Sequence, residues 1–540
     1  MPVISFINEN INVTVEEGVS ILAGARAAGI TIESPCNAMG TCGKCKVIIH
    51  GQPPENPGAA VLACQTPVSG NIAVLVKDYR EENRSLRILA AGSGFSYEKA
   101  PFITKHFRGG ATQVYGGDKP LGVEEGNTAA ACYGVVVDIG TTTIVSVLVD
   151  LHTGGELASD SILNPQTVYA QDVLSRIHFA SKPEGLETLH RVFIEALRAM
   201  LFKMTSRAAA DILNIYEVVF SGNTTMIHLA CAEDPAPLGR YPYAPAIWGA
   251  NHIPADTLGI SPFGRIYLPP VISAYVGADI TSGILASRLD EKKGAAVFID
   301  VGTNGEMVIA KDGTLAAAST AAGPAFEGMN ISCGMRANSG AIEAFHIDDD
   351  GNFSFTVIGG GTAKGICGSG LLDMCAELVR TGVIGSNGRF VFPEKGNCSD
   401  RLKKSFRSKD GKNAFFITDD VYLAQKDIRQ IQLAKGAIRC GIEMLLAGLG
   451  IDAENVETVE IAGSFGFHLN ENSLINIGMI PPRFAGKVRF AGNTSLSGGL
   501  AFLLNTAFRE KMKALVKRIN KIELAADPGF ERNFIKYLNF

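Results

Sequence analysis

Hydrophobic and polar positions near the start of the chain alternate as they do in a small sheet crossed by one helix. Residues 3–7 form an apolar run, an asparagine-containing turn follows, and residues 11–15 alternate as a second strand should. Residues 20–28 are alanine-rich and stop at a glycine, which is typical of a short helix. Two later apolar runs predict further strands, at residues 46–50 and 72–77. This order predicts a β-grasp domain over residues 1–78.

The longer, later part of the chain alternates apolar strands with helical segments, which indicates an α/β domain. One strand–turn–strand pattern occurs twice within it: GVVVDIGTTTIVSVLVD begins at Gly134, and AVFIDVGTNGEMVIA begins at Ala296. Two copies of one pattern indicate a domain built from duplicated halves. We therefore expect a multidomain α/β protein whose large domain, residues 132–540, divides into halves at 132–290 and 291–540.

The segment between these two parts, residues 79–131, has mixed charge, little apolar periodicity and many glycines. Such a composition predicts a linker. A small irregular subdomain is the alternative, because several apolar side chains lie within the segment, Phe95, Phe102, Ile103 and Phe107.

Composition narrows the possible functions. The chain has 540 residues, 46% of them hydrophobic, which is enough for several buried cores. Its formal net charge is -5 and it has no basic run with interleaved aromatic residues, so nucleic acid is not expected as a partner. The first residues lack the pattern of a signal peptide, and no apolar stretch approaches the ~18 residues of a membrane span. We expect a cytoplasmic protein with no membrane partner.

Cysteine usage points to metal or redox chemistry, because eleven cysteines in a large chain of this kind do not suit a disulfide framework. Gly40 and Gly43 lie in the segment PCNAMGTCGKC, where they allow a loop to wrap around a cluster and direct N–H groups at its sulfur atoms. Structural zinc is the alternative, although zinc sites usually pair two short knuckles. Four clustered thiolates suit a 2Fe–2S cluster and are its candidate ligands, Cys36, Cys42, Cys45 and Cys64.

Through this loop the first domain resembles the adrenodoxin-type and plant-type ferredoxins. The resemblance implies a one-electron carrier of low potential. The remaining cysteines are scattered in apolar or glycine-rich surroundings and are expected to be small buried hydrophobes. Two of them, Cys333 and Cys367, lie beside glycines, and a second cluster bridged across a dimer is the alternative for this pair.

The two copies of the repeat are candidate phosphate-binding loops. Each places an aspartate at the end of a predicted buried strand, followed by a glycine turn whose N–H groups can approach phosphate oxygens. The aspartates, Asp138 and Asp300, are the candidate catalytic residues, since they can hold hydrated Mg2+ and orient the attacking water. The other candidate loop residues are Gly140, Thr141, Thr142 and Thr143 in the first copy and Gly302, Thr303 and Asn304 in the second.

A third element of this site is a short strand at residues 459–462 that ends in Gly463 and Ser464, where adenosine can pass closely. Before it, Asp427 is expected to cap a helix that packs beneath the nucleotide. The apolar face of that helix comprises Ile428, Ile431, Ala434, Ile438, Ile442 and Leu445.

Two further residues of this part of the chain have alternative interpretations. His228, within TTMIHLA, is expected to be a structural histidine rather than a ligand, because apolar residues flank it. Glu306 either reaches Mg2+ or is an exposed carboxylate of a hairpin.

The loops together resemble the superfamily of acetate kinase, sugar kinases, Hsp70 and actin. Within it, the chain is similar to the ATPase domain of reductive activators of corrinoid proteins, which also carry an N-terminal 2Fe–2S domain. The similar motifs are SGNTTMIHLA from Ser221, YVGADI from Tyr275, AAGPAFEG from Ala321, GICGSGLLD from Gly365, QLAKGAI from Gln432 and IAGSFGF from Ile461. The resemblance implies an actin-like, ribonuclease H-like ATPase domain of two lobes, with Gly323 at the nucleotide.

This resemblance implies an ATP-hydrolysing activase that uses a 2Fe–2S cluster, ATP and Mg2+ to reduce inactive Co(II) to Co(I) in a corrinoid protein of a methyltransferase system. It also implies a low-potential electron donor, such as a ferredoxin or flavodoxin, and a homodimer. Three alternatives stay open: an activator of a radical enzyme such as a 2-hydroxyacyl-CoA dehydratase or benzoyl-CoA reductase, a redox-sensing phosphotransferase, and a non-redox ATPase of the hydantoinase type.

Overall fold

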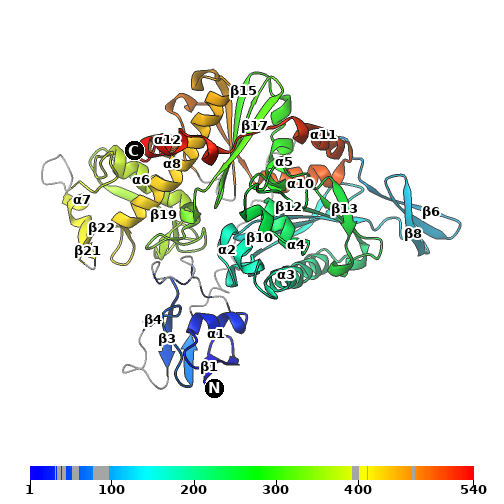
Figure 1. The fold of residues 1–540 in the computed structure, drawn as a ribbon, viewed down its shortest axis with the longest axis horizontal. Helices are drawn as coiled ribbons and strands as arrows, with labels where there is room; N and C mark the ends of the chain where they lie inside the picture. The colour runs from blue at the N-terminus through cyan, green and yellow to red at the C-terminus, as the bar shows by residue number, and fades with distance from the viewer. Residues whose placement is uncertain are drawn as a thin grey trace. The chain divides into compact units, whose positions relative to one another are not determined.

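The protein was analysed as a computed structural model (Figure 1). It describes residues 1–30, 32, 34, 38, 40, 44–50, 60–76, 97–391, 400–409, 411–463 and 469–540. The chain divides into two compact units. The first comprises Met1–Arg87, Pro165–Phe179 and Pro324–Gln432, and the second comprises Ile88–Asn164, Ala180–Gly323 and Leu433–Phe540. Both copies of the predicted repeat belong to the second unit.

The first domain is a five-stranded sheet crossed by one helix, which is the β-grasp arrangement predicted from the sequence. Its strand order is β2-β1-β5-β3-β4, with β1 antiparallel to β2 and parallel to β5. Ser20 caps the helix, because its side chain accepts a hydrogen bond from the Ala23 amide at 3.2 Å. The elements are β1 (Val3–Phe6), β2 (Ile11–Thr14), α1 (Ile21–Ala27), β3 (Lys46–His50), β4 (Ala60–Leu62) and β5 (Ile72–Leu75). Of these, β4 was not predicted, because a three-residue strand is too short to show an alternating pattern.

Residues 97–131 contain a regular antiparallel sheet, whereas the sequence pattern predicted a linker or an irregular subdomain for residues 79–131. The sheet has the order β6-β7-β8. Its glycines misled the prediction: Gly109, Gly110 and Gly117 have positive φ and form the two hairpin turns rather than a flexible connector. The strands are β6 (Ile103–Arg108), β7 (Ala111–Gly116) and β8 (Lys119–Glu125). Residues 77–96 lie outside the described part of the chain.

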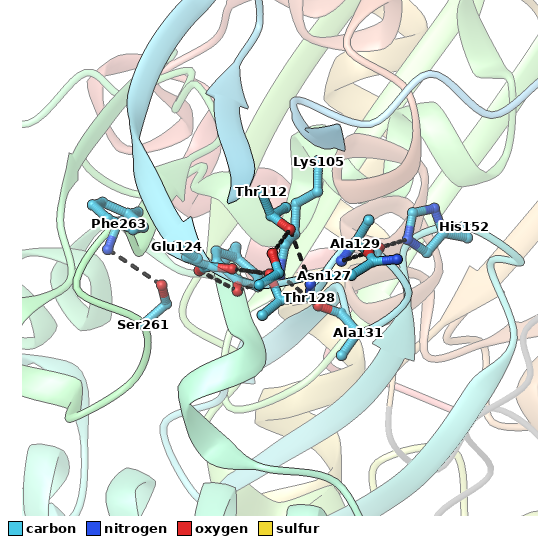
Figure 2. A network of polar contacts seen from close by, with 12 residues as sticks. Lys105, Thr112, Glu124, Asn127, Thr128, Ala129, Ala131, His152, Ser261 and Phe263 are labelled. Carbon is cyan, nitrogen blue, oxygen red and sulfur yellow. Dashed lines mark hydrogen bonds and ion pairs between the residues drawn. The ribbon is translucent and has the colours of Figure 1, made fainter. Parts of the chain in front are cut away.

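A buried polar network attaches this sheet to the large domain (Figure 2). The Lys105 ammonium is fully buried and forms an ion pair with Glu124 at 2.8 Å. It also donates hydrogen bonds to the Tyr216 hydroxyl at 2.7 Å and to the Ala131 carbonyl at 3.1 Å. Tyr216 in turn donates to Glu124 at 2.6 Å, and Thr128 donates to the same carboxylate. Burial raises the pKa of Glu124, but these hydrogen bonds outweigh it and hold the pKa below its ordinary value.

The large domain contains two six-stranded sheets that share the topology of five of their strands. In each, a three-stranded antiparallel meander is continued by two parallel strands, giving β11-β10-β9-β12-β14 in the first sheet and β17-β16-β15-β24-β25 in the second. The first sheet comprises β9 (Tyr133–Ile139), β10 (Thr143–Asp150), β11 (Glu156–Leu163), β12 (Ile215–Gly222), β13 (Asn251–Pro254) and β14 (Arg265–Leu268). The second comprises β15 (Ala295–Val301), β16 (Gly305–Lys311), β17 (Thr314–Thr320), β24 (Val456–Ala462), β25 (Val488–Gly492) and β26 (Asn520–Lys521). The duplication predicted from the repeat is therefore present.

Helices position the ends of these strands. Figure 1 shows α5 (Ala278–Ala286) and α10 (Thr494–Leu504) side by side, and α10 also packs against β9 and β12. Other helices of the second unit are α3 (Gly185–Arg207), α4 (Thr224–Ala230), α9 (Glu471–Asn476), α11 (Ala507–Leu515) and α12 (Phe530–Lys536). Among the described residues, no helix combines the length and hydrophobicity that a membrane span needs.

The predicted apolar helix is α8 (Gln425–Gly448), and the six residues of its predicted stripe are fully buried. It begins two residues before Asp427, whose carboxylate reaches back to the Ala424 amide at 2.8 Å and caps the helix from its first turn. The remaining elements are α2 (Val173–Ala180), β18 (Ala341–Ile347), β19 (Phe353–Val357), β20 (Gly365–Ile366), α6 (Gly368–Arg380), α7 (Asp400–Ser405), β21 (Phe406–Lys409), β22 (Lys412–Phe416) and β23 (Tyr422–Ala424).

The Lys105→Met variant should lose about 3 kcal/mol of unfolding free energy, because it leaves the Glu124 carboxylate without its buried cation. Urea denaturation followed by circular dichroism measures this loss. Lys119→Met is the matched control, since Lys119 is an exposed lysine of the same sheet. Equal stability of the two variants would contradict the role given to the Lys105 network.

Candidate functional site

The first predicted phosphate loop is a tight turn between β9 and β10. The Gly140 amide donates to the Thr143 carbonyl at 3.0 Å, and a Cβ atom at Gly140 would lie 2.5 Å from that same oxygen. Two asparagines fix the turn from outside: Asn164 donates to the Gly140 carbonyl at 2.8 Å, and Asn223 donates to the Thr141 hydroxyl at 3.1 Å. The Asn164 backbone amide also donates to the Thr142 carbonyl at 2.8 Å.

The second predicted loop is the equivalent turn between β15 and β16. The Gly302 amide donates to the Asn304 carbonyl at 2.9 Å, which closes the turn. The Gly323 amide donates to the Thr303 carbonyl at 2.9 Å. The glycine that resemblance alone placed at the nucleotide therefore lies against the second turn.

Gly463 lies beside the second catalytic candidate, at the end of β24. Its φ is +115°, a conformation that glycine adopts readily, and a Cβ atom there would lie 2.4 Å from the Val301 carbonyl and 3.2 Å from Asp300 Oδ1. The structure thus brings the third predicted element up to Asp300. Ser464, predicted with it, lies outside the described residues.

Asp138 is held by two side chains at the start of α10. Asn493 Nδ2 donates to Asp138 Oδ2, and the Ser495 hydroxyl donates to Asp138 Oδ1, both at 2.8 Å. Burial raises the pKa of Asp138, and these two hydrogen bonds act against that rise. Sequence reasoning missed both donors, although GNTS at residues 492–495 carries the asparagine and serine that typify a helix N-terminus.

Three further carboxyl groups gather around the second turn. Burial and the nearby Asp138 charge raise the pKa of Asp300 to about 7. Burial and the charge of Asp300 raise the pKa of Asp279, the acidic residue in the first turn of α5. Glu306 pairs with Asp300 across β15 and β16, and burial with the charges of Asp279 and Asp300 raises its pKa well above the ordinary value. Glu306 is only 6% exposed, so its interpretation as an exposed hairpin carboxylate is wrong.

The carboxyl group cluster is suited to binding a divalent cation whose other ligands are water and phosphate oxygens. It consists of Asp138, Asp279, Asp300 and Glu306. Within the described residues, none of these carboxylates is paired with lysine or arginine, and no three His, Cys, Asp or Glu side chains converge as a complete metal site. Mg2+ is commonly held by one or two carboxylates together with water and substrate phosphates. The carboxyl-rich donor set therefore fits Mg2+ that arrives with a nucleotide. Asp279 is the member that sequence reasoning missed, though it lies within the motif YVGADI.

The cluster-binding loop of the first domain is described in part. Cys45 is fully buried and Cys64 is 9% exposed, and their Sγ atoms lie 3.2 Å apart. Gln65 braces the loop, because its Nε2 donates to the Ala38 carbonyl at 2.8 Å and lies 3.6 Å from Cys64 Sγ. Two adjacent buried thiols with an amide donor beside them fit the 2Fe–2S cluster. The other two predicted ligands, Cys36 and Cys42, lie outside the described residues.

His228 is a structural histidine, as the sequence predicted. Its Nδ1 is 2.8 Å from the Thr224 carbonyl, and its Nε2 accepts hydrogen bonds from the Ala246 and Ile247 amides. Burial lowers the pKa of His228, which favours the neutral ring that this arrangement needs.

The surroundings of Cys333 and Cys367 do not support the alternative that these two cysteines bind a second cluster across a dimer. The Cys367 thiol is buried 3.2 Å from the Ile342 carbonyl, and the Cys333 sulfur accepts a hydrogen bond from the Tyr422 amide at 3.4 Å. Burial raises the pKa of both thiols, which disfavours the thiolate that a cluster requires.

Comparison with known proteins finds three matched segments in the chain. Residues 5–69 match the 2Fe-2S iron-sulfur cluster binding domain, residues 133–292 match the RACo middle region, and residues 294–540 match the C-terminal domain of RACo, the ASKHA domain. The corrinoid activation enzyme RamQ of Eubacterium limosum is 34% identical over 417 residues, which cover 75% of this chain and 69% of that enzyme. This chain belongs to the family of corrinoid activation enzymes.

Two further relatives of this corrinoid activation enzyme are similar over most of its length. A Co(II) methylated amine-specific corrinoid protein reductase of Methanosarcina barkeri is 25% identical over 446 residues, covering 76% of this chain and 77% of the relative. A solved structure described as a reductive activator for corrinoid, iron-sulfur protein superposes with a TM-score of 0.75 and 28% identity, covering 100% of this chain and 98% of that one. The predicted family and fold class are confirmed. The N-terminal domain is of the type that binds a 2Fe–2S cluster, and the C-terminal domain is of the type that binds ATP, which Mg2+ accompanies.

In the corrinoid activation enzyme without nucleotide or Mg2+, Asp300→Asn should stabilise the fold at pH 8 and much less at pH 5. The pKa of Asp300 is about 7 in the folded protein against 3.8 for the ordinary group, so the folded state keeps a proton that the unfolded state releases. Wild-type stability therefore falls as the pH rises from about 4 to about 7, while the asparagine variant lacks this loss.

Urea denaturation at both pH values tests this expectation. Asp256→Asn, a substitution at an exposed aspartate, is the control. A stability difference between wild type and Asp300→Asn that is the same at pH 5 and pH 8 would contradict the raised pKa.

Proposed function

We propose that this protein reactivates a corrinoid protein by passing one electron to its cobalt, from Co(II) to Co(I), in a reaction driven by ATP. The observation that carries the proposal is the presence, in one polypeptide, of a cluster-binding domain and a domain with two phosphate turns facing a carboxyl group cluster. A bound 2Fe–2S cluster would supply the single electron. An ATPase domain adds the free energy that an uphill transfer requires.

The described residues account for the nucleotide half of this activity. The Gly140 and Gly302 amides close their own turns, and the other N–H groups of these turns would bind phosphate oxygens, because glycine turns form small anion-binding concavities. Asp138, fixed in orientation by its two hydrogen bonds, would hold hydrated Mg2+. Asp300 has a pKa of about 7, so near neutral pH it can accept the proton of the attacking water. Thr141, Thr142, Thr143, Thr303, Asn304, Gly323, Gly463 and Ser464 complete the proposed nucleotide contacts.

The electron-transfer part of the proposed function depends on four proposed ligands of the 2Fe–2S cluster, Cys36, Cys42, Cys45 and Cys64. ATP can drive the transfer only through states of the protein that bind nucleotide and partner with different affinities. The proposal therefore requires that the Co(II) partner bind more tightly to one nucleotide state than to another.

The finer parts of the proposal concern organisation and partners. We propose domain boundaries at 1–78, 79–131 and 132–540, with the last divided into 132–290 and 291–540. The upstream donor is a low-potential ferredoxin or flavodoxin, since the cluster is expected to accept electrons near -400 mV. A homodimer and a cytoplasmic location complete the proposal, the latter because clustered reduced thiols persist in a reducing compartment.

Mixing the reconstituted protein, a strong reductant, Mg-ATP and an oxidised corrinoid protein should produce the Co(I) absorption band, and omitting ATP should abolish it. Cys64→Ser should lose the electron transfer while retaining nucleotide binding, because Cys64 lies in the first domain and the phosphate turns do not. Cys231→Ser, at a cysteine outside that domain, is the control. Co(I) formation without ATP, or by Cys64→Ser at the wild-type rate, would contradict the proposal.

A further inference from the structure

We infer that Asn493 and Ser495 are positioning residues that fix the Asp138 carboxylate for Mg2+-nucleotide binding, and that Ser221 and Ser282 hold Ser495 in place. The inference deepens the proposed function, on which it rests, by naming residues that act through Asp138. All five residues belong to one compact unit and come from β9, β12, α5 and the start of α10.

The direct contacts leave the Asp138 carboxylate little freedom to rotate. Each of its two oxygens accepts a hydrogen bond of 2.8 Å, one from Asn493 Nδ2 and the other from the Ser495 hydroxyl. An ionised carboxylate has about four acceptor positions, so both oxygens can still bind a hydrated cation on their remaining lone pairs. The two donors thus set the plane of the carboxylate without occupying its outer side.

Asn493 has its own orientation fixed by the helix that it begins. Its Oδ1 accepts a hydrogen bond from the Leu496 amide at 2.9 Å, which is the usual contact of an N-cap residue. Because Oδ1 is engaged by this amide, Nδ2 must face Asp138. The cap of α10 and the orientation of Asp138 therefore depend on one side chain.

Ser495 is the end of a chain of three buried hydroxyl groups. Ser221 Oγ lies 2.9 Å from Ser495 Oγ and 2.8 Å from Ser282 Oγ, and Ser221 and Ser282 are fully buried. The Ser495 hydroxyl lies within donating distance of both Asp138 Oδ1 and Ser221 Oγ, and the Ser221 hydroxyl in turn reaches the Ala278 carbonyl at 3.3 Å as well as Ser282 Oγ. Hydroxyl groups in such a series polarise one another and strengthen the final hydrogen bond.

The series of hydroxyl groups from Ser282 to Ser495 lies where α5 and α10 approach closely. A Cβ atom at Gly498 of α10 would lie 2.0 Å from the Ser282 carbonyl of α5, so the glycine permits a contact that no other residue allows. This contact holds the Ser282 and Ser495 hydroxyls at bonding distance from Ser221. Asp300 has no comparable pair of side-chain donors among the described residues, and the causes of its raised pKa are burial and the Asp138 charge alone.

The experiment compares the affinity for ADP with and without Mg2+, measured by calorimetry on the full-length reconstituted protein. If Ser495 positions Asp138, Ser495→Ala should reduce the gain in affinity that Mg2+ confers by about tenfold, which is roughly the effect of losing one charge-assisted hydrogen bond. The affinity for ADP without Mg2+ should stay within twofold of wild type. Ser221→Ala keeps the direct contact and should give a smaller loss. Asn493→Ser keeps a capping residue but shortens the donor, so it should resemble Ser495→Ala.

Ser497→Ala is the matched control, because Ser497 lies one position beyond Leu496 in the same helix and its hydroxyl donates to the Asn493 carbonyl, at 3.1 Å, rather than to Asp138. A Mg2+-dependent gain in Ser495→Ala equal to that of Ser497→Ala would overturn the inference. A loss of affinity of the same size with and without Mg2+ would also overturn it, because it would indicate a merely structural role. A wild-type protein whose ADP affinity does not respond to Mg2+ would instead contradict the proposed nucleotide site itself.

Discussion

The burial of several carboxyl groups at the two glycine turns, and the repulsion among them, is the constraint on which the rest of this structure depends. Two copies of one strand–turn–strand unit bury Asp300 near Asp138, and burial together with the charge of Asp138 raises the pKa of Asp300 to about 7. Asp279 and Glu306 add to the same concentration of negative charge. A divalent cation would stabilise such a site, because it relieves the repulsion among the carboxylates. In the proposed function, Mg2+-nucleotide would relieve this repulsion, and coupling to electron transfer requires such a difference in binding free energy between states of the protein.

The remainder of the large domain holds these groups in place. The hydroxyl chain from Ser282 to Ser495 fixes Asp138, while Asn164 and Asn223 brace the turn beside it. The sheet of β6, β7 and β8 is fastened to β12 through Lys105 and Glu124, so it forms part of the ATPase unit rather than a tether.

The sequence predicted those features that repeat or have a characteristic spacing. The β-grasp order, the duplicated halves, the two glycine turns and the apolar stripe of α8 could all be found because local periodicity or a repeated motif encodes them. Asp279, Asn493 and Ser495 were missed because their role comes from long-range packing that brings α5 and α10 to the end of β9. The three-stranded sheet was missed for a different reason: glycine punctuation is shared by linkers and by hairpin turns, and only the pairing of β6 with β7 and β8 distinguishes them.

The central claim is that Mg2+-nucleotide neutralises this carboxyl group cluster, and proton exchange on binding tests it most directly. Calorimetric titration of Mg-ADP at pH 7, in two buffers of different ionisation enthalpy, gives the number of protons released. Because Asp300 is about half protonated at that pH in the free protein, the account predicts that wild type releases more protons than Asp300→Asn. Equal proton release by the two proteins would show that the nucleotide leaves the cluster's protonation unchanged, and would contradict the account.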